Sequence, residues 1–330
     1  MRLLAAMVAC SGPSDDPGSN SRSPPLDVED SEVAGPWSKV TSELLESCGV
    51  TVDGQLGCWS PASGSAAGET YPELQPPPAG VWTEVALASS STLRGLNGDI
   101  CALDQDGGIC CWGGSYGSSG ECLSSRMDGP FRKVIVGTVF ACGLGVAGEL
   151  SCWSSTPDPQ PVPLAAGVAD MTTNGFNLWV LSSDRTMSAW AMWDADPWLM
   201  YEGRVFSDAE GELGLIEHAN ACVYEIVTGS VWCEPSEPYG YDVSHLAGAV
   251  PADAQRVEGD ESEGYCALTE AQEVVCSYTD QAVAPWLTLS DVADLSVTSH
   301  SPGAGCVVTR SGHIECWGNQ LAPTDVLWAE

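Results

Sequence analysis

Short stretches of alternating apolar and polar residues run along this chain, and glycine, proline and aspartate separate them. Alternation with a period of two is typical of β-strands with one buried face. The clearest stretch, Gly98 to Gly113, reads Gly-Asp-Ile-Cys-Ala-Leu-Asp-Gln-Asp-Gly-Gly-Ile-Cys-Cys-Trp-Gly. Two short apolar runs flank an Asp-Gly turn, which predicts an antiparallel β-hairpin.

The two cysteines of this hairpin set its register. If Cys101 faces Cys111, then Asp104 faces Gly108, and residues 105–107 form the loop. A three-residue hairpin loop favours a type I turn followed by a left-handed residue, a conformation that glycine adopts without steric cost. Gly107 stands at that position, so the cysteine spacing and the turn chemistry agree.

The same unit recurs seven times along the chain. Five copies have two cysteines ten positions apart: Cys48 and Cys58, Cys101 and Cys111, Cys142 and Cys152, Cys266 and Cys276, and Cys306 and Cys316. In the copy that starts at Cys266, Gln272 replaces the loop glycine.

Two further copies are irregular. In one, Trp179 and Ala189 occupy the cysteine positions, which predicts that a large residue packed against a small one replaces the bond. In the other, Cys222 and Cys233 are eleven positions apart, and the loop is one residue longer. Both copies fit the same hairpin geometry.

The copies follow one another at intervals of 53, 41, 37, 43, 44 and 40 residues. A period of about 40 residues is typical of radial or stacked repeats rather than of separate globular domains. Between the hairpins lie further apolar stretches that we expect to be strands, at residues 81–87, 131–136, 168–171 and 287–297. Three or four short strands per repeat suffice for one blade of a β-propeller.

These residues resemble the regulator of chromosome condensation repeat, particularly its extracellular bacterial branch with a cysteine pair in each repeat. The resemblance rests on the run Cys-Ala-Leu, Asp-Gly, Cys-Trp-Gly and on the loops after Trp112 and Trp317. It implies an all-β fold, a seven-bladed β-propeller over residues 37–330, with an intra-hairpin disulfide in most blades. Residues 322–328 resemble the strand before each hairpin, so we expect them to pair near Trp37 and close the ring.

The net charge of the chain excludes some classes of binding partner. The 330 residues include 11 Lys and Arg against 45 Asp and Glu, which gives a formal charge of −34. Such a charge repels nucleic acid phosphates and anionic lipid headgroups. We therefore expect no nucleic acid partner.

The first residues, Met1 to Cys10, resemble a bacterial lipoprotein signal, with one basic residue, an apolar run and Val8-Ala9 before the cysteine. We expect residues 1–9 to be a signal peptide and Cys10 to carry the lipid that attaches the protein to a membrane. A misassigned start codon or a chance apolar tip is the alternative. Residues 10–36 are rich in Ser, Pro, Gly, Asp and Glu, which predicts a disordered acidic tether. The protein would then be exported and anchored in the bacterial cell envelope, at the outer membrane or cell surface.

The chain has fifteen cysteines. Lipidation takes Cys10 and six hairpin pairs take twelve, which leaves Cys110 and Cys122. Adjacent strand residues point to opposite faces, so Cys110 does not compete with Cys111 for Cys101, and we predict a seventh bond between Cys110 and Cys122. Seven disulfides indicate an oxidising compartment. Zinc is disfavoured because Cys-x-x-Cys pairs near a histidine are absent from the sequence.

No motif indicates catalysis, so we expect no enzyme activity, no metal and no cofactor. The four histidines lack metal-ligand spacing and a nucleophile motif: His218, His245, His300 and His313. Two acidic runs, at residues 208–212 and 258–263, are interpreted as solvated loops, with calcium binding as the alternative.

Aromatic residues concentrate in the fourth repeat, near Trp190. Three of them form either a ligand or sugar-binding patch or packing that fills the space of the missing disulfide: Trp193, Trp198 and Tyr201.

We therefore expect a monomeric, non-catalytic propeller that binds another protein through its loops. The resemblance also implies a narrower alternative, inhibition of a secreted enzyme, because some relatives inhibit secreted β-lactamases. A glycan-binding or hydrolytic propeller is a further alternative. Guanine nucleotide exchange, the activity of the family's eukaryotic namesake, is disfavoured for an exported, acidic chain.

Overall fold

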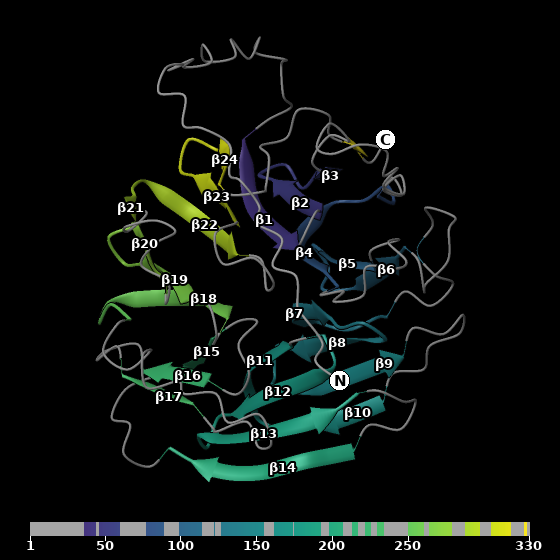
Figure 1. Cartoon of the computed structure of the whole chain (residues 1–330). Helices are drawn as coiled ribbons and strands as arrows, with labels where there is room; N and C mark the ends of the chain where they lie inside the picture. The colour runs from purple at the N-terminus through teal and green to yellow at the C-terminus, as the bar shows by residue number, and fades with distance from the viewer. Residues whose placement is uncertain are drawn as a thin grey trace, which may run out of the picture. The chain divides into compact units, whose positions relative to one another are not determined.

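The computed structural model of this protein describes residues 36–43, 46–59, 77–88, 99–113, 122, 127–154, 162–173, 175–192, 198–206, 213–216, 222–225, 230–233, 250–260, 264–278, 288–297, 305–317 and 327–328. All of them belong to the second of two compact units, Met1–Ala34 and Gly35–Glu330. They form seven antiparallel sheets around a common centre (Figure 1). The predicted all-β, seven-bladed propeller is confirmed. Within these ranges there is no helix with the length and apolar character that a membrane span requires.

Each sheet, or blade, is built in the same way. Its innermost strand comes first in the sequence, and the two strands of the hairpin follow outward. The innermost strands of blades 1 to 7 are β1 (Trp37–Glu43), β4 (Trp82–Leu87), β7 (Phe131–Val136), β11 (Val168–Thr173), β15 (Leu213–Leu215), β18 (Ala254–Asp260) and β22 (Val292–Val297).

The hairpins supply the middle and third strands of the blades. They are β2 (Glu46–Thr51) with β3 (Leu56–Trp59), β5 (Ile100–Asp104) with β6 (Ile109–Trp112), β8 (Phe140–Gly145) with β9 (Leu150–Ser154), β12 (Asn177–Ser182) with β13 (Thr186–Ala191), β16 (Cys222–Glu225) with β17 (Val231–Cys233), β19 (Gly264–Thr269) with β20 (Val274–Tyr278), and β23 (Gly305–Thr309) with β24 (Ile314–Trp317). Described outer strands occur in blades 1, 3, 4 and 6: β25 (Leu327–Trp328), β10 (Val162–Ala165), β14 (Trp198–Val205) and β21 (Thr288–Leu289).

Two strand predictions need correction. The stretch predicted as one strand over residues 287–297 contains two in its described part, 288–297: β21 is the outer strand of blade 6, β22 is the inner strand of blade 7, and Asp291 lies between them with φ 66°. The C-terminal strand β25 does join blade 1, but it pairs with β3 at the outer edge. Because β1 already pairs with β2 and its other edge faces the centre, the outer edge is where another strand can be added to this sheet.

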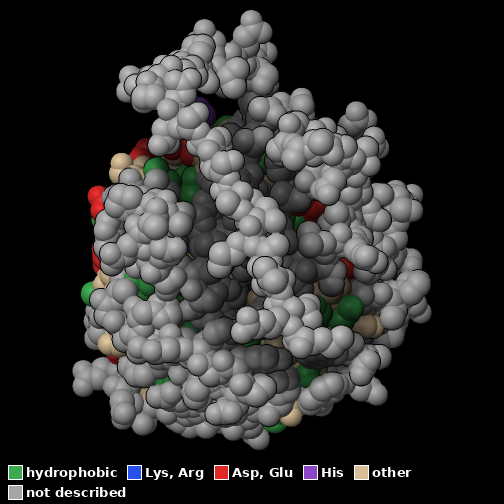
Figure 2. All heavy atoms as spheres, in the orientation of Figure 1, with side chains coloured by type: hydrophobic (Ala, Val, Ile, Leu, Met, Phe, Trp, Pro, Cys, Tyr) green, Lys and Arg blue, Asp and Glu red, His purple; other side chains and the backbone are tan. Residues whose placement is uncertain are grey.

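The apolar core lies between neighbouring blades rather than within one layer. Seven clusters of buried side chains follow one another around the ring, and each contains residues of two adjacent blades. The cluster that closes the ring contains Trp37 and Trp59 of blade 1 with Cys306 and Val308 of blade 7. At the surface, acidic side chains are visible at several places around the perimeter (Figure 2).

Disulfides fasten the hairpins in the predicted register. Cys48–Cys58, Cys101–Cys111, Cys142–Cys152, Cys266–Cys276 and Cys306–Cys316 are bonded, with Cα–Cα distances of 4.0–4.1 Å. Cys222 is also disulfide-bonded, and its register partner is Cys233. In blade 4, Trp179 faces Ala189 as expected, and its ring packs into the cluster between blades 4 and 5.

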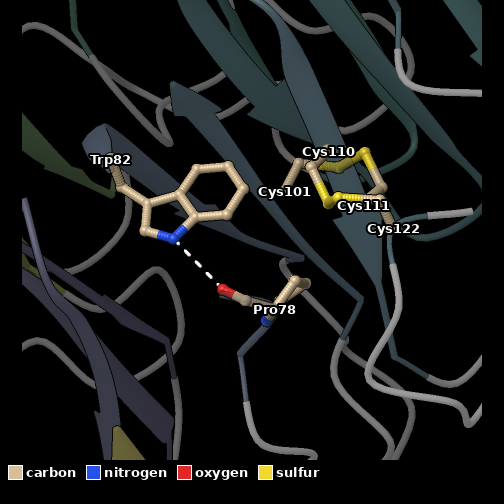
Figure 3. Close-up of a disulfide and its surroundings, with 6 residues drawn as sticks. All are labelled: Pro78, Trp82, Cys101, Cys110, Cys111 and Cys122. Atoms are coloured by element: carbon tan, nitrogen blue, oxygen red, sulfur yellow. Dashed lines mark hydrogen bonds between the residues drawn. A yellow bond between two sulfur atoms is a disulfide. The ribbon is translucent and has the colours of Figure 1, made fainter. Parts of the chain in front are cut away.

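Blade 2 carries a second disulfide, Cys110–Cys122, beside Cys101–Cys111 (Figure 3). Because Cys110 and Cys111 are adjacent in β6, the two bonds leave the strand on opposite faces. Met127 then exchanges two backbone hydrogen bonds with Ile109, at 3.1 Å each. Cys122 and Met127 are therefore both attached to β6, the outermost described strand of blade 2.

The hairpin loops also connect neighbouring blades. The third loop residue accepts a backbone hydrogen bond from the start of the next blade, for example Gly54 O from Trp82 N and Gly107 O from Phe131 N, at 2.9 and 3.0 Å. Gly312 O accepts from Trp37 N at 2.9 Å, which connects blade 7 to blade 1. The loop is thus a turn and an inter-blade contact at the same time.

This third loop residue is left-handed in every described loop. Gly54, Gly107, Gly148 and Gly312 have φ between 79° and 86°, whereas Arg185 and Gln272 have φ of 68° and 61°. A residue with a Cβ atom pays about 1–2 kcal/mol for this conformation. Blades 4 and 6 therefore carry backbone strain that the glycine-containing blades avoid.

Replacing Gln272 with glycine is expected to raise the free energy of unfolding by about 1 kcal/mol, because glycine removes the strain at φ 61°. The urea midpoint measures the change. The control is Ala271→Gly in the same exposed loop, where positive φ is absent and glycine brings only extra chain entropy. Equal midpoints for Gln272→Gly and the unmodified protein would contradict the explanation.

Candidate functional site

The innermost strands of all seven blades enclose a cavity of about 350 Å³, here called the central cavity. Its lining comes from β1, β4, β7, β11, β15, β18 and β22, with Tyr224 contributed by the neighbouring strand β16. Residues more than 250 positions apart in the sequence meet there, as in the pair Lys39 and Asp294. The central cavity is therefore a product of the closed ring.

A β-bulge recurs at the start of the innermost strand in six blades. The register with the neighbouring strand shifts between the first and the third residue, as between Trp37 and Lys39 in β1. A bulge redirects the side chains around it. The third residue is charged in all six blades and lines the central cavity: Lys39, Glu84, Lys133, Asp170, Arg256 and Asp294.

The signs of these six charges alternate around the ring, so opposite charges are neighbours. Lys133 Nζ lies 2.9 Å from Asp170 Oδ1, and Arg256 Nη1 lies 2.9 Å from Asp294 Oδ1. Lys39 Nζ approaches the same oxygen of Asp294 at 3.4 Å. Each of these ion pairs joins two adjacent blades.

The carboxylates also bind the backbone of the next blade. Asp294 Oδ2 accepts from Val40 N at 2.9 Å, and Asp170 Oδ2 accepts from Leu215 N at 3.3 Å. Glu84 Oε1 accepts from Val134 N at 3.4 Å. Charge-assisted hydrogen bonds to backbone N–H groups are stronger than neutral ones, so each acid fixes the relative position of two innermost strands.

Blade 5 departs from the pattern, and a ring of seven requires such a departure because an odd number of charges cannot alternate in sign. The equivalent position is Gly214, and a Cβ atom there would lie 2.7 Å from the Tyr224 ring. Tyr224 Oη donates to Gln255 O of blade 6 at 3.0 Å. The neutral tyrosine thus occupies the charged position and maintains the contact between the two blades.

Positive charge is scarce in this chain but concentrated in the central cavity. Four of the 11 Lys and Arg line it, including both lysines of the sequence: Lys39, Arg132, Lys133 and Arg256. Four carboxylates line it as well: Glu43, Glu84, Asp170 and Asp294. Among the described lining residues, positive and negative charges are therefore equal in number, in a protein whose formal charge is −34.

A second candidate surface is formed by the hairpin loops together with the residues just before the innermost strands, here called the hairpin face. Among the described residues, four large apolar side chains are exposed, and three of them lie on the hairpin face of blades 1 to 3: Val52 (59%), Val81 (46%) and Val146 (60%). The fourth, Leu199 (38%), lies on the outer strand β14. The hairpin face of blades 1 to 3 also carries exposed carboxylates: Asp53, Asp106, Asp128 and Glu149.

The sequence-predicted site residues have mixed outcomes. Cys10, Trp193, His218, His245 and His300 lie outside the described residues, as do residues 208–212 and the side chains of Trp198 and Tyr201. His313 is described, and it is an exposed loop residue just before β24 whose ring lies 3.2 Å from Ser311 Oγ. Among the described residues, no group of His, Cys, Asp or Glu could hold a metal ion.

The interpretation of residues 258–263 as a solvated loop is wrong at its start. Glu258 lies in β18 with a fully buried side chain, and its Oε2 accepts from Val297 N at 2.7 Å. Its Oε1 lies 2.6 Å from Arg256 Nε. The sequence around Glu258 is polar and predicts a loop. The two groups that bind its carboxylate, Arg256 after the bulge of β18 and Val297 N in blade 7, come together only in the folded ring.

The charged ring and the valines were missed in the sequence. A signal for the ring was present: the start of the innermost strand in six blades reads apolar, any residue, charged, apolar, as in Trp37-Ser-Lys39-Val40 and Val292-Ala-Asp294-Leu295. Unequal spacing from the cysteines hides this pattern. The valines carry no sequence signal, because a lone exposed apolar residue gains meaning only from its neighbours in space.

One partly buried acid, Glu46, lies apart from the ring, at the start of β2. Burial raises the pKa of Glu46 from 4.5 to about 7, and the charge of Asp99 adds to the effect. Its register partner Glu43 and Asp99 are both buried. The folded protein therefore favours protonated Glu46, and this contribution to stability is present below about pH 4.5 and lost as the pH rises to about 7.

Replacing Glu46 with glutamine is expected to raise the free energy of unfolding at about pH 8 by about 1–2 kcal/mol and to leave it nearly unchanged at about pH 4, because the amide imitates the neutral acid. Urea midpoints at the two pH values measure this difference. Glu149→Gln, in the exposed loop of blade 3, is the control. An equal effect of Glu46→Gln at both pH values would refute the assignment.

Seven sheets around a central cavity define a β-propeller, and solved structures agree. No family model and no curated protein sequence matches this chain. The chain is similar to the β-propeller domain of Cps50 (Swd1) from Myceliophteria thermophila, with 13% identity and a TM-score of 0.55 over 86% of this chain and 96% of that one. It is also similar to human WBSCR16, with 12% identity and a TM-score of 0.51 over 81% of this chain and 85% of that one.

A third similar structure is PorZ, a surface component of the type-IX secretion system of Porphyromonas gingivalis. The identity is 13% and the TM-score 0.51, over 89% of this chain and 38% of that one. At such identities the similarity shows the fold alone.

Proposed function

We propose that this protein is an exported, non-catalytic β-propeller, tethered to the cell surface through a lipid on Cys10, that binds another protein through its hairpin face. We assign it to the cysteine-paired bacterial branch of the regulator of chromosome condensation repeats. The disulfides support an oxidising compartment outside the cytoplasm. Inhibition of a secreted enzyme is the narrower form of this proposal.

The observation that carries the proposal is the grouping of exposed valines on one face of three consecutive blades. Val52 and Val146 lie in loops of disulfide-bonded hairpins, and Val81 O accepts a backbone hydrogen bond from Gln105 N at 3.2 Å, so the three valines are presented on a rigid backbone. Rigid apolar residues surrounded by polar ones are typical of protein interfaces. The carboxylates on the same face favour a partner whose contact surface is apolar at its centre and basic at its rim.

The test is capture of envelope proteins by the purified protein and by its variants. Val52→Ser with Val146→Ser is expected to weaken capture about tenfold or more, since both valines would lose buried apolar area. Leu199→Ser is the matched control, because it removes an exposed apolar side chain from outside the hairpin face. Equal capture by all three proteins, or repeated failure to enrich any protein, would contradict the proposal. The mass of the mature protein tests acylation of Cys10 separately.

A further inference from the structure

The central cavity combines both signs of charge at short range, which is uncommon in a chain with four times as many acidic as basic residues, 45 against 11. Around its lining each cationic blade has an anionic neighbour: Lys39 and Asp294, Lys133 and Asp170, Arg256 and Asp294. A volume of about 350 Å³ lies at the lower end of the range of small-molecule sites, roughly 300–1,000 Å³.

We infer that the central cavity binds a small zwitterion of the class of ω-amino acids, in which a carbon chain separates the ammonium group from the carboxylate group. A simple dianion placed beside the cations would also lie near the carboxylates of the adjacent blades, and a dication would lie near the flanking cations. A molecule with one ammonium and one carboxylate group matches the alternating pattern at either end. It carries no net charge, so the overall charge of −34 does not repel it.

Two lining residues are placed to bind the ends of such a ligand. Lys39 is the most exposed cation of the ring, at 47% against 18% for Lys133 and 31% for Arg256. Its partner Asp294 already accepts from Arg256 and from Val40 N, so Lys39 can bind a ligand carboxylate without leaving Asp294 unsatisfied. Asp170, at 25% exposure, is more accessible to a ligand ammonium than Asp294, at 4%.

The remaining lining suits the carbon atoms of an amino acid. Ala86 and Ile135 occupy the fifth position of their innermost strands, two residues beyond Glu84 and Lys133, and both line the central cavity. The ring of Tyr224 supplies an aromatic wall where blade 5 lacks a charge. The site therefore offers charged groups for both ends of the ligand and apolar contact between them.

The experiment is calorimetric titration of the oxidised full chain with a panel of ω-amino acids of increasing chain length, with succinate as a dianion, putrescine as a dication and glucose as a neutral probe. At least one amino acid is expected to bind with a Kd below about 1 mM, and succinate and putrescine at least about tenfold more weakly. Lys39→Gln is expected to weaken amino acid binding about tenfold, and Lys39→Arg to retain it. The matched control Arg310→Gln removes an exposed cation of the hairpin face, outside the central cavity, and leaves binding unchanged.

Three results would overturn the inference: no amino acid binding up to about 10 mM, equal binding of succinate, or full binding by Lys39→Gln. The melting temperature of each variant shows that it is folded, and Lys39→Gln is expected to melt near the unmodified protein because its ion pair is long and half-exposed. The site is independent of the hairpin face. The Val52→Ser, Val146→Ser protein keeps amino acid binding, and Lys39→Gln keeps protein capture, so failure of one proposal is distinguishable from failure of the other.

Discussion

Replacing Gly312 with alanine is expected to lower the free energy of unfolding by about 2–4 kcal/mol, because this glycine lies where blade 7 meets blade 1. Its φ of 82° costs a residue with a Cβ atom about 1–2 kcal/mol. The added Cβ would also lie 2.5 Å from Pro36 Cα and closer still to Pro36 Cβ. Pro36 cannot move away easily, because its carbonyl accepts from Val52 N and the next residue, Trp37, donates to Gly312 O.

Gly167→Ala separates the two causes of this loss. Gly167 has a similar φ of 70°, but the nearest atom to its added Cβ is Ser183 Oγ at 3.5 Å, an ordinary contact. This control is expected to lose only about 1 kcal/mol. The difference in urea midpoint between the two variants then measures the steric part of ring closure. If both variants unfolded at the same urea concentration, the contact between Gly312 and Pro36 would have no special role.

Removal of one hairpin disulfide is expected to have an effect of similar size. The double variant Cys142→Ala, Cys152→Ala should lose about 2.5–3 kcal/mol, because the bond closes a loop of about eleven residues that the unfolded chain would otherwise leave open. Both sulfur atoms are also buried, so their loss removes packing in the cluster between blades 3 and 4. Urea unfolding under oxidising conditions measures the loss.

Two comparisons make the disulfide measurement specific. Ser151→Ala, next to Cys152 and half-buried, is expected to change stability by less than about 0.5 kcal/mol. Reductant should also destabilise the unmodified protein more than the double variant, since the variant has one bond fewer to lose. A double variant as stable as the unmodified protein would show that strand pairing alone fixes this hairpin.

The hairpin predictions succeeded because they depend on residues close together in the chain. Cys101 faces Cys111, Gly107 is left-handed, and Trp179 faces Ala189, all in the predicted register. In a hairpin the loop length and the side-chain period of two fix the pairing, so the number of residues between two positions determines whether they face each other. Even Gln272, which breaks the glycine rule, keeps the left-handed conformation of the loop.

Predictions about segments between hairpins were less accurate because their partners are distant in the sequence. Residues 287–297 look like one apolar strand, yet they belong to two blades. Glu258 looks like part of a polar loop, yet it binds Arg256 and Val297 N inside the ring. Neither outcome follows from local pattern, because each is decided by where the neighbouring blade places its backbone.

The sequence by itself therefore determined the repeat, the strand pairing inside each hairpin and the positions of the disulfides, since these follow from local geometry that every copy repeats. The tertiary structure decided which side chains lie next to one another around the central cavity. Lys39 lies beside Asp294 only because the seven blades close into a ring. Because the number of blades is odd, a seventh charge would break the alternation of signs, and Tyr224 occupies that position instead. Contacts of this kind depend on the angle between sheets, which no single repeat encodes.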